Sequence, residues 1–145
     1  MDLNRCIIFN VSLEGFREHR HTADWELEAW APEITGLFIH AAYGMNKLIN
    51  LKLLPDKPVI CFLDVVADDY EGLLVKFLGE LIYLLESRKQ GFTLFELKVE
   101  NFHLSGKLQG ALISSIDKEI KAVTWHKLRV SQNSKGYRVN IVFDV

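Results

Sequence analysis

The chain has 145 residues, 49% of them hydrophobic and 25% charged, which is typical of a globular protein with a sizeable core and excludes a disordered or fibrous one. A formal net charge of −2 lacks the basic excess of proteins that bind nucleic acid tightly through many phosphates. The two cysteines, Cys6 and Cys61, lie far apart without a CxxC pair, so neither a disulfide framework nor a thiolate zinc site is indicated.

No targeting or membrane-spanning pattern is present in the sequence. Residues 1–13 lack the apolar region and cleavage site of a signal peptide. The most apolar later stretch, residues 73–85, is broken by Lys76 and Glu80 and is too short to span a bilayer. No repeat or linker divides the chain. We expect a single domain over residues 1–145, located in the cytoplasm, with no membrane partner.

The first half of the chain is predicted to contain strands and helices in turn. A strand is expected at residues 25–30, directly after a polar loop. After Pro32, apolar residues recur at helical spacing as far as residue 49, which predicts a helix with one buried stripe. The run at residues 59–63 has the length and β-branched content of a buried strand.

A second amphipathic helix is predicted next. Asp68 and Glu71 resemble a capping box, in which each side chain accepts a hydrogen bond from a free N–H at the start of a helix. The apolar stripe from residue 70 to residue 85 is wide enough to cover a sheet. Gly91 is expected to mark the exit from this helix.

The rest of the chain has a strand pattern. Two strands are expected, the second with Gly106 and Gly110 at turns or bulges. A hairpin should follow, with one strand at residues 120–130, a turn at residues 133–136 and a partner strand at residues 137–143. These elements predict an α+β fold in which two amphipathic helices pack on a mainly antiparallel sheet.

The densest polar cluster, residues 19–24, precedes the first predicted strand, where ligands often bind. Thr22 and Asp24 could hold a turn through hydrogen bonds from side chain to backbone. His19 and His21 would face the same way in an extended chain, as a metal-binding pair does, although a third ligand is not defined. The residues alone leave these alternatives open.

The chain end offers a second candidate site. In a strand, Asp144 projects away from the apolar face, and the terminal carboxylate of Val145 lies one residue away. The alternative is a frayed terminus with a solvated aspartate. If Asp24 joined this pair, carboxylates about 4 Å apart would repel by ~4 kcal/mol at an effective dielectric near 20, so a hard cation such as calcium or magnesium would be required.

Sequence motifs of catalysis are scarce. The chain has no GxGxxG, Walker A, GxSxG or HExxH pattern, so the common nucleotide-binding and hydrolase signatures are missing. Lys121 and His126 belong to a segment of alternating charged and apolar residues, typical of a solvated strand face. The enzyme-class alternative is a small metal-dependent hydrolase that uses Asp24 with His21 or His126 as a base.

Taken together, several segments resemble the archease family. They are residues 21–24 (HTAD), residues 121–126 (KAVTWH), residues 143–145 (FDV) and the long helix at residues 73–84. Their order and spacing agree with that family, and the likeness covers most of the chain. The resemblance implies a strand-helix-strand-strand module inserted into the α+β sheet.

The resemblance also implies a metal site made of Asp24, Asp144 and the terminal carboxylate of Val145. Calcium is the first expectation for the cation, with magnesium or manganese as alternatives. Lys121 and His21 are expected to contact the partner protein or its nucleotide, because an ammonium on an exposed face can neutralise a phosphate.

The function implied by the resemblance is that of a non-catalytic accessory protein. It would promote guanylylation and multiple turnover of an RtcB-type tRNA-splicing RNA ligase and broaden the nucleotides that the ligase accepts. The ligase would hold the tRNA and perform the chemistry. The alternative role suggested for the family is a chaperone or modulator of RNA-processing enzymes such as tRNA methyltransferases.

Two features depart from the family pattern. Arg20 stands where members usually carry an acidic residue before the histidine, and we expect this cation to weaken metal binding. The segment at residues 110–118 is shorter than in many members, so a partner contact made by that loop would differ in this chain.

Overall fold

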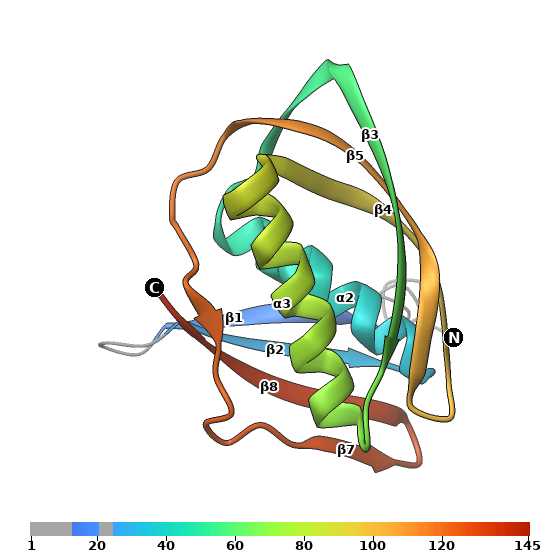
Figure 1. The fold of residues 1–145 in the computed structure, drawn as a ribbon. Coiled ribbons are helices and arrows are strands. Elements are labelled where there is room, and N and C mark those ends of the chain that lie inside the picture. Colours follow the sequence, from blue (N-terminus) through green and yellow to red (C-terminus); the bar gives the residue numbers. More distant parts are fainter. Residues whose placement is uncertain (1–12, 21–24) are drawn as a thin grey trace, which may run out of the picture.

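The computed structural model describes residues 13–20 and 25–145 and arranges their strands in two antiparallel sheets (Figure 1). The first sheet has the order β1-β2-β8-β6, with β7 also paired to β8, and the second has the order β3-β5-β4. The strand bounds in the first sheet are β1 Gly15–Arg20, β2 Trp25–Ala31, β6 Ala122–Val123, β7 Val130–Asn133 and β8 Gly136–Asp144. In the second they are β3 Lys52–Val66, β4 Gln90–Glu100 and β5 His103–Ser115.

The second sheet is formed by a continuous insertion. Helix α2 (Ile34–Leu48) follows β2, and the chain then runs through β3, helix α3 (Tyr70–Arg88), β4 and β5 before it returns to the first sheet at β6. This strand-helix-strand-strand order confirms the predicted α+β class and the inserted module. Two separate sheets are present in place of the one sheet that the sequence pattern predicted.

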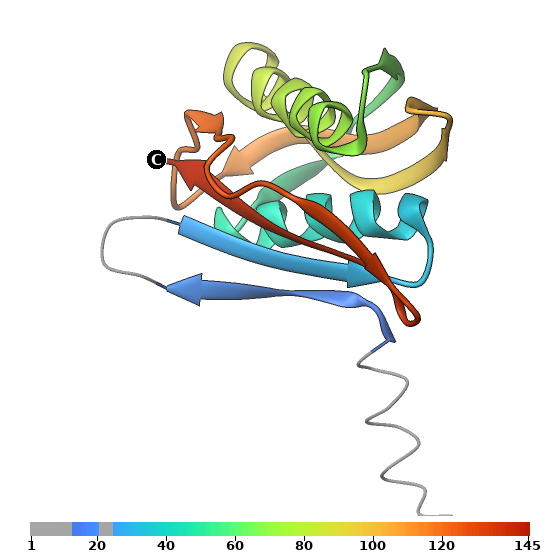
Figure 2. The same cartoon turned by 90° about the horizontal axis from the view of Figure 1, so that it is seen from below.

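Helix α2 lies between the two sheets, in contact with β2 on one side and β4 on the other (Figure 2). Its apolar stripe is fully buried at Leu37, Phe38 and Met45, as the helical spacing after Pro32 predicted. A Cβ at Gly44 would lie 2.6 Å from the methyl groups of Leu27, so a larger residue there would force this buried side chain or the helix to shift. The helix thereby seals the core beneath the five-stranded sheet.

Helix α3 begins one residue later than the sequence pattern predicted. The N-cap is Asp69, whose Oδ1 accepts a hydrogen bond from the N–H of Gly72 (2.7 Å). Glu71 does not complete a capping box, because its Oε1 accepts the N–H of Val130 (2.9 Å) and so ties the helix to β7. The helix ends at Arg88, and Lys89 adopts the left-handed conformation (φ 56°). The predicted exit at Gly91 is wrong, since that residue already belongs to β4.

The predicted single strand over residues 120–130 is also wrong. Only β6 and β7 are extended in this region, and a loop separates them. In this loop the N–H of Leu128 donates to the carbonyl of Trp125 (3.2 Å), and Lys127 has a φ of 55°, which a continuous strand cannot accommodate. The predicted hairpin turn is confirmed, because Asn133 pairs with Gly136 across the β7–β8 turn.

Gly106 and Gly110 lie within β5, at neither end of the strand. A Cβ at Gly110 would clash with the carbonyl oxygen of Gly91 on β4, so close backbone approach explains this glycine. The register shifts between Phe92 and Leu94, opposite Gly110, so the predicted bulge is confirmed at this position. Strand β1 was not predicted, because its polar side chains lack a clear alternation.

The described residues bury apolar side chains only, without a buried charged group. The strand at residues 59–63 was predicted to be buried, but Cys61 of β3 is half-exposed and Ile60 and Phe62 are exposed; Cys6 lies outside the described residues. No helix within residues 13–20 and 25–145 is long and apolar enough to cross a bilayer.

Candidate functional site at the end of β8

The last residues of β8 are held between two other strands. Phe143 is buried and pairs with Trp25 of β2 on one side and with Val123 of β6 on the other. The next residue, Asp144, pairs with Ala122, and its carbonyl accepts a hydrogen bond from the N–H of Lys121 (2.8 Å). The main chain at Asp144 is therefore part of the sheet rather than a loose end.

Side chains at this end of β8 alternate as the strand pattern predicted. Phe143 packs in the core, the carboxylate of Asp144 is exposed to solvent, and Val145 is half-buried against the core. A main chain held in the sheet combined with a solvent-exposed carboxylate suits a group that binds a ligand from solution. The donors on offer are oxygen anions, which fit a hard cation such as calcium or magnesium.

Asp24 and His21 lie outside the described residues. Strand β2 begins at Trp25, directly after Asp24, and Trp25 is in register with Phe143, directly before Asp144. Within residues 13–20 and 25–145, no three His, Cys, Asp or Glu side chains cluster as metal ligands. The predicted metal site therefore depends on Asp24 and stays a prediction.

Two lysines stand near the end of β8. Lys121 is exposed, and its N–H donates to the carbonyl of Asp144, so these two residues are neighbours in the sheet. The Lys118 ammonium lies 5.2 Å from the ring centroid of Trp25, in a cation–π contact. The sequence pattern did not single out Lys118, because only the fold brings it to the start of β2.

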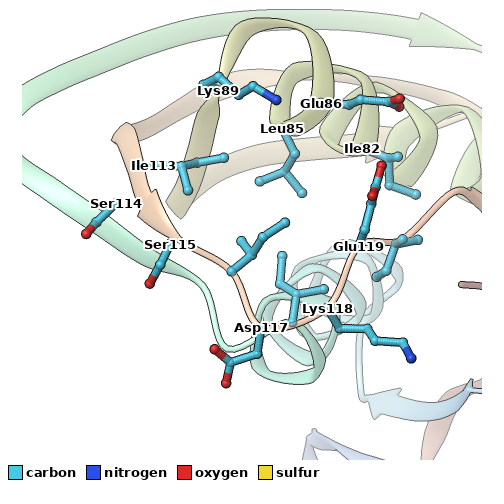
Figure 3. A pocket seen from close by; sticks show the side chains of 13 residues that line it. Ile82, Leu85, Glu86, Lys89, Ile113, Ser114, Ser115, Asp117, Lys118 and Glu119 are labelled. Atoms are coloured by element: carbon cyan, nitrogen blue, oxygen red, sulfur yellow. The ribbon is translucent and has the colours of Figure 1, made fainter.

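A hollow of about 500 Å³ adjoins this site on the other side of the loop at residues 116–120 (Figure 3). Ile82 and Leu85 of α3 and Ile113 of β5 line it with apolar atoms, whereas Lys118 points away from it. The same loop thus forms a wall of the hollow and carries Lys118 to Trp25. No signal in the sequence indicated this hollow.

The loop between β6 and β7 presents an exposed aromatic side chain. Trp125 is 62% exposed and lies beside the N-terminus of α3, near Gly72. His126 is also exposed, and its N–H donates to the Oγ1 of Thr124 (3.3 Å). An exposed tryptophan is a frequent anchor in protein interfaces, so Trp125 is a candidate contact that the strand interpretation of this segment had missed.

His19, the other half of the predicted histidine pair, has a different neighbour. Its Nε2 lies 3.5 Å from Oε2 of Glu28, and Arg138 donates to Oε1 of the same carboxylate (2.7 Å). These contacts hold β1, β2 and β8 together. Because His21 lies outside the described residues, the pair itself is not tested.

Comparisons with known proteins identify relatives over most of the chain. Residues 16–145 match the Archease protein family (MTH1598/TM1083). Protein archease of Archaeoglobus fulgidus is 31% identical over 134 residues, which cover 86% of this chain and 95% of that protein. The probable protein archease of Mycobacterium tuberculosis is 31% identical over 137 residues, which cover 90% of this chain and 75% of that protein.

Two solved structures share the fold. The solution structure of Methanobacterium thermoautotrophicum protein 1598 has a TM-score of 0.65 at 17% identity and covers 90% of this chain and 99% of its own. The crystal structure of a Thermotoga maritima archease, described as a possible chaperone, has a TM-score of 0.64 at 18% identity and covers 89% of this chain and 94% of its own.

Proposed function

The chain belongs to the archease family, and we propose that it is a non-catalytic activator of an RtcB-type tRNA-splicing RNA ligase. It promotes guanylylation of the ligase, sustains multiple turnover and broadens the nucleotides that the ligase uses. The ligase holds the tRNA and makes the new bond. This division of labour fits a chain with a net charge of only −2.

The observation that supports this proposal is the meeting of Lys121 and Asp144 at one end of the five-stranded sheet. These residues come from two of the segments that carry the family resemblance, and the N–H of Lys121 binds the carbonyl of Asp144. Trp25, the neighbour of Asp24, is one register step away. Lys121 directly precedes β6, and both Lys121 and Asp144 are exposed to solvent at this end of the sheet.

We propose that Asp24, Asp144 and the carboxylate of Val145 hold a divalent cation, with calcium as the first expectation and magnesium or manganese as alternatives. When bound, the cation supplies positive charge for phosphate oxygens. The main chain that carries Asp144 and Val145 is held in the sheet, because β8 is paired on both sides at Phe143. Arg20, next to this segment, is expected to reduce cation affinity through like-charge repulsion.

Lys121 and His21 are proposed to contact the ligase or its nucleotide. Lys121 is exposed beside Asp144, so its ammonium can neutralise a phosphate that approaches the carboxylate site. Lys118 adds a second cation at the start of β2. These lysines offset the repulsion that the acidic residues alone would exert on a nucleotide.

The proposal is tested by guanylylation of an RtcB-type ligase from the same source, followed as label transfer from GTP with and without this protein. Wild-type protein is expected to accelerate labelling, and Asp144→Ala is expected to abolish the acceleration. Asp56→Ala, which removes an exposed aspartate from β3 in the other sheet, is the matched control and should accelerate labelling like the wild type. Equal acceleration by all three proteins would refute the acidic site.

The second candidate role is that of a chaperone or modulator of RNA-processing enzymes, such as a tRNA methyltransferase. The Thermotoga maritima relative is described as a possible chaperone, and this chain exposes Phe62 (75%) and Trp125 (62%). This role predicts that Asp144→Ala still keeps a partner enzyme in solution. A metal-dependent hydrolase is the enzyme-class alternative, and turnover of a phosphodiester by the pure protein would support it.

A further inference from the structure

The two edges of the three-stranded sheet differ in chemistry. On the outer face of the edge strand β4, Glu96, Lys98 and Glu100 are exposed, and a bulge interrupts the register. Charged side chains and bulges are devices that protect a sheet edge from pairing with another chain. On the outer face of β3, Ile60 and Phe62 are exposed by 57% and 75%, without a charge between them. At residues 59–63 the β3 edge thus lacks the charges and the bulge that protect β4.

Alternate residues of β3 also direct their backbone N–H and C=O groups away from the sheet. The N–H of Ala67 donates to the carbonyl of Phe102 (3.1 Å), so the backbone groups of Ala67 point toward the strand that contains β5. Because these directions alternate along an antiparallel strand, the N–H and C=O groups of Ile60, Phe62 and Asp64 point away from β5. No strand of the described ranges pairs with β3 on that side.

Prolines limit the free part of this edge. Pro55 and Pro58 lack an N–H and stand in the first half of β3, where the register to β5 is irregular. From residue 59 to residue 66 the register is regular and free of proline. The part of the edge that can accept another strand therefore begins at residue 59, after the second proline.

Helix α3 leaves space beside this edge. A hollow of about 590 Å³ lies between residues 62–66 of β3 and the exposed side of α3 at Lys76, Gly79 and Glu80. Among the described residues, no neighbouring atom lies within 4 Å of the place that a Cβ would take at Gly79. Lys76 donates to the carbonyl of Val66 (2.7 Å) and so marks the end of the free edge.

We propose that a second copy of this chain pairs antiparallel with residues 59–63 of β3 about a two-fold axis. Ile60 of each copy lies opposite Phe62 of the other, which places the two Cys61 residues at the axis. This register sets apolar residues opposite apolar ones and keeps Asp64 away from Asp64 of the other copy. The three strands of each copy then form one continuous sheet.

The features on α3 favour a second copy over an unrelated strand. The same two-fold axis brings the two α3 helices side by side, and Gly79 allows the close approach that a large side chain would prevent. Lys76 and Glu80 carry opposite charges on neighbouring turns, so an antiparallel copy brings Lys76 of one helix toward Glu80 of the other. A two-fold pair uses the same edge twice and leaves no β3 edge for further growth.

This pairing leaves the site at the end of β8 accessible. Figures 1 and 2 place the later half of β3 on the opposite side of the molecule from the C-terminus. Each copy of the dimer can therefore present its own Asp144. The proposal concerns the isolated protein, so its test is independent of ligase activation.

The test is sedimentation velocity of the wild-type protein and two variants over a wide range of concentration. The wild type is expected to shift from monomer to dimer as the concentration rises. Phe62→Glu should weaken dimerisation roughly tenfold or more, because it sets charge into the apolar centre of the interface. Leu94→Glu is the matched control and should dimerise like the wild type, since Leu94 is likewise an exposed apolar residue (57%) but lies on β4.

A monomer at every concentration would overturn the proposal, as would a dimer that both variants weaken equally. Cysteine crosslinking provides a second test that leaves Phe62 unchanged. In a Cys6→Ser background, copper-catalysed oxidation should link two chains through Cys61, because directly opposed residues on antiparallel strands have Cβ atoms about 4.5–5.5 Å apart. A dimer that does not crosslink under conditions that oxidise free cysteine would contradict the β3 interface.

Discussion

The carboxylate of Asp144 is exposed on a main chain that β2 and β6 hold from both sides. At the residue scale, we predict that the affinity for a divalent cation depends on the carboxylate of Asp144. Asp144→Asn should weaken calcium binding roughly tenfold or more, because the number of charged ligands sets the affinity of such sites. Isothermal titration with calcium and with magnesium measures this, and Asp56→Asn serves as the control. Equal affinity in all three proteins would place the cation elsewhere.

Cys61 allows a second prediction at this scale. Burial, with the negative charge of Glu80 as a smaller cause, raises the pKa of the Cys61 thiol above its usual value of 9.0. The thiol therefore stays mostly protonated at neutral pH, and its alkylation rate should rise with pH and level off only above pH 9.0. Glu80→Gln should move this acceleration to lower pH.

The measurement is the rate of alkylation against pH in a Cys6→Ser background, at concentrations where the chain is monomeric. A midpoint below 9.0 would contradict the assigned environment of Cys61. The raised pKa could not be predicted from the sequence, because the proximity of Glu80 to Cys61 arises only when α3 packs on β3.

The sequence predicted which single residues of the candidate site are exposed, but it did not predict which of them lie next to one another. Alternation along a strand predicted that Asp144 faces solvent while Phe143 is buried, and the structure agrees. The contact between Lys121 and Asp144 depends on β6, a strand of two residues that has no periodic signal of its own. Trp125 was assigned to a strand face, whereas the loop that exposes it follows from tertiary contacts.

At the element scale, the start of α3 shows how neighbouring residues compete for one role. Asp68 and Asp69 are both suitable N-cap residues, and the sequence pattern favoured Asp68 because Glu71 lies three residues later. In the structure Glu71 binds the N–H of Val130, so the box does not form and Asp69 caps the helix. A contact to a strand that is distant in sequence decided the outcome.

This assignment predicts a difference between two neighbouring substitutions. Asp69→Ala should lower the free energy of unfolding by about 1 kcal/mol, since it removes the side-chain acceptor for the N–H of Gly72. Asp68→Ala, at an exposed position before the cap, should change stability much less. Chemical denaturation of the two variants measures both effects. A larger loss for Asp68→Ala would support the capping box that the sequence pattern suggested.

Long elements with a strong period were predictable, and short or irregular ones were not. The helices α2 and α3 carry wide apolar stripes, so their existence followed from the sequence alone. Strand β1 is held by its pairing with β2 and by Glu28, which binds both His19 and Arg138. These contacts are set by the fold, so the local pattern of β1 gave no signal.

At the scale of the whole molecule, the insertion between α2 and β6 separates two surfaces. The five-stranded sheet carries the candidate site at the end of β8, and the inserted module carries the free edge of β3. The inserted module followed from the family resemblance, whereas the division into two sheets required the strand pairings themselves. The proposed activator role depends on the first surface and the proposed dimer on the second.

The measurement that tests the central claim most directly is multiple-turnover RNA ligation by an RtcB-type ligase from the same source. Wild-type protein should raise the number of turnovers per ligase, Asp144→Ala should return the ligase to its unassisted level, and Asp56→Ala should match the wild type. Turnover that the wild-type protein does not raise would contradict the activator role.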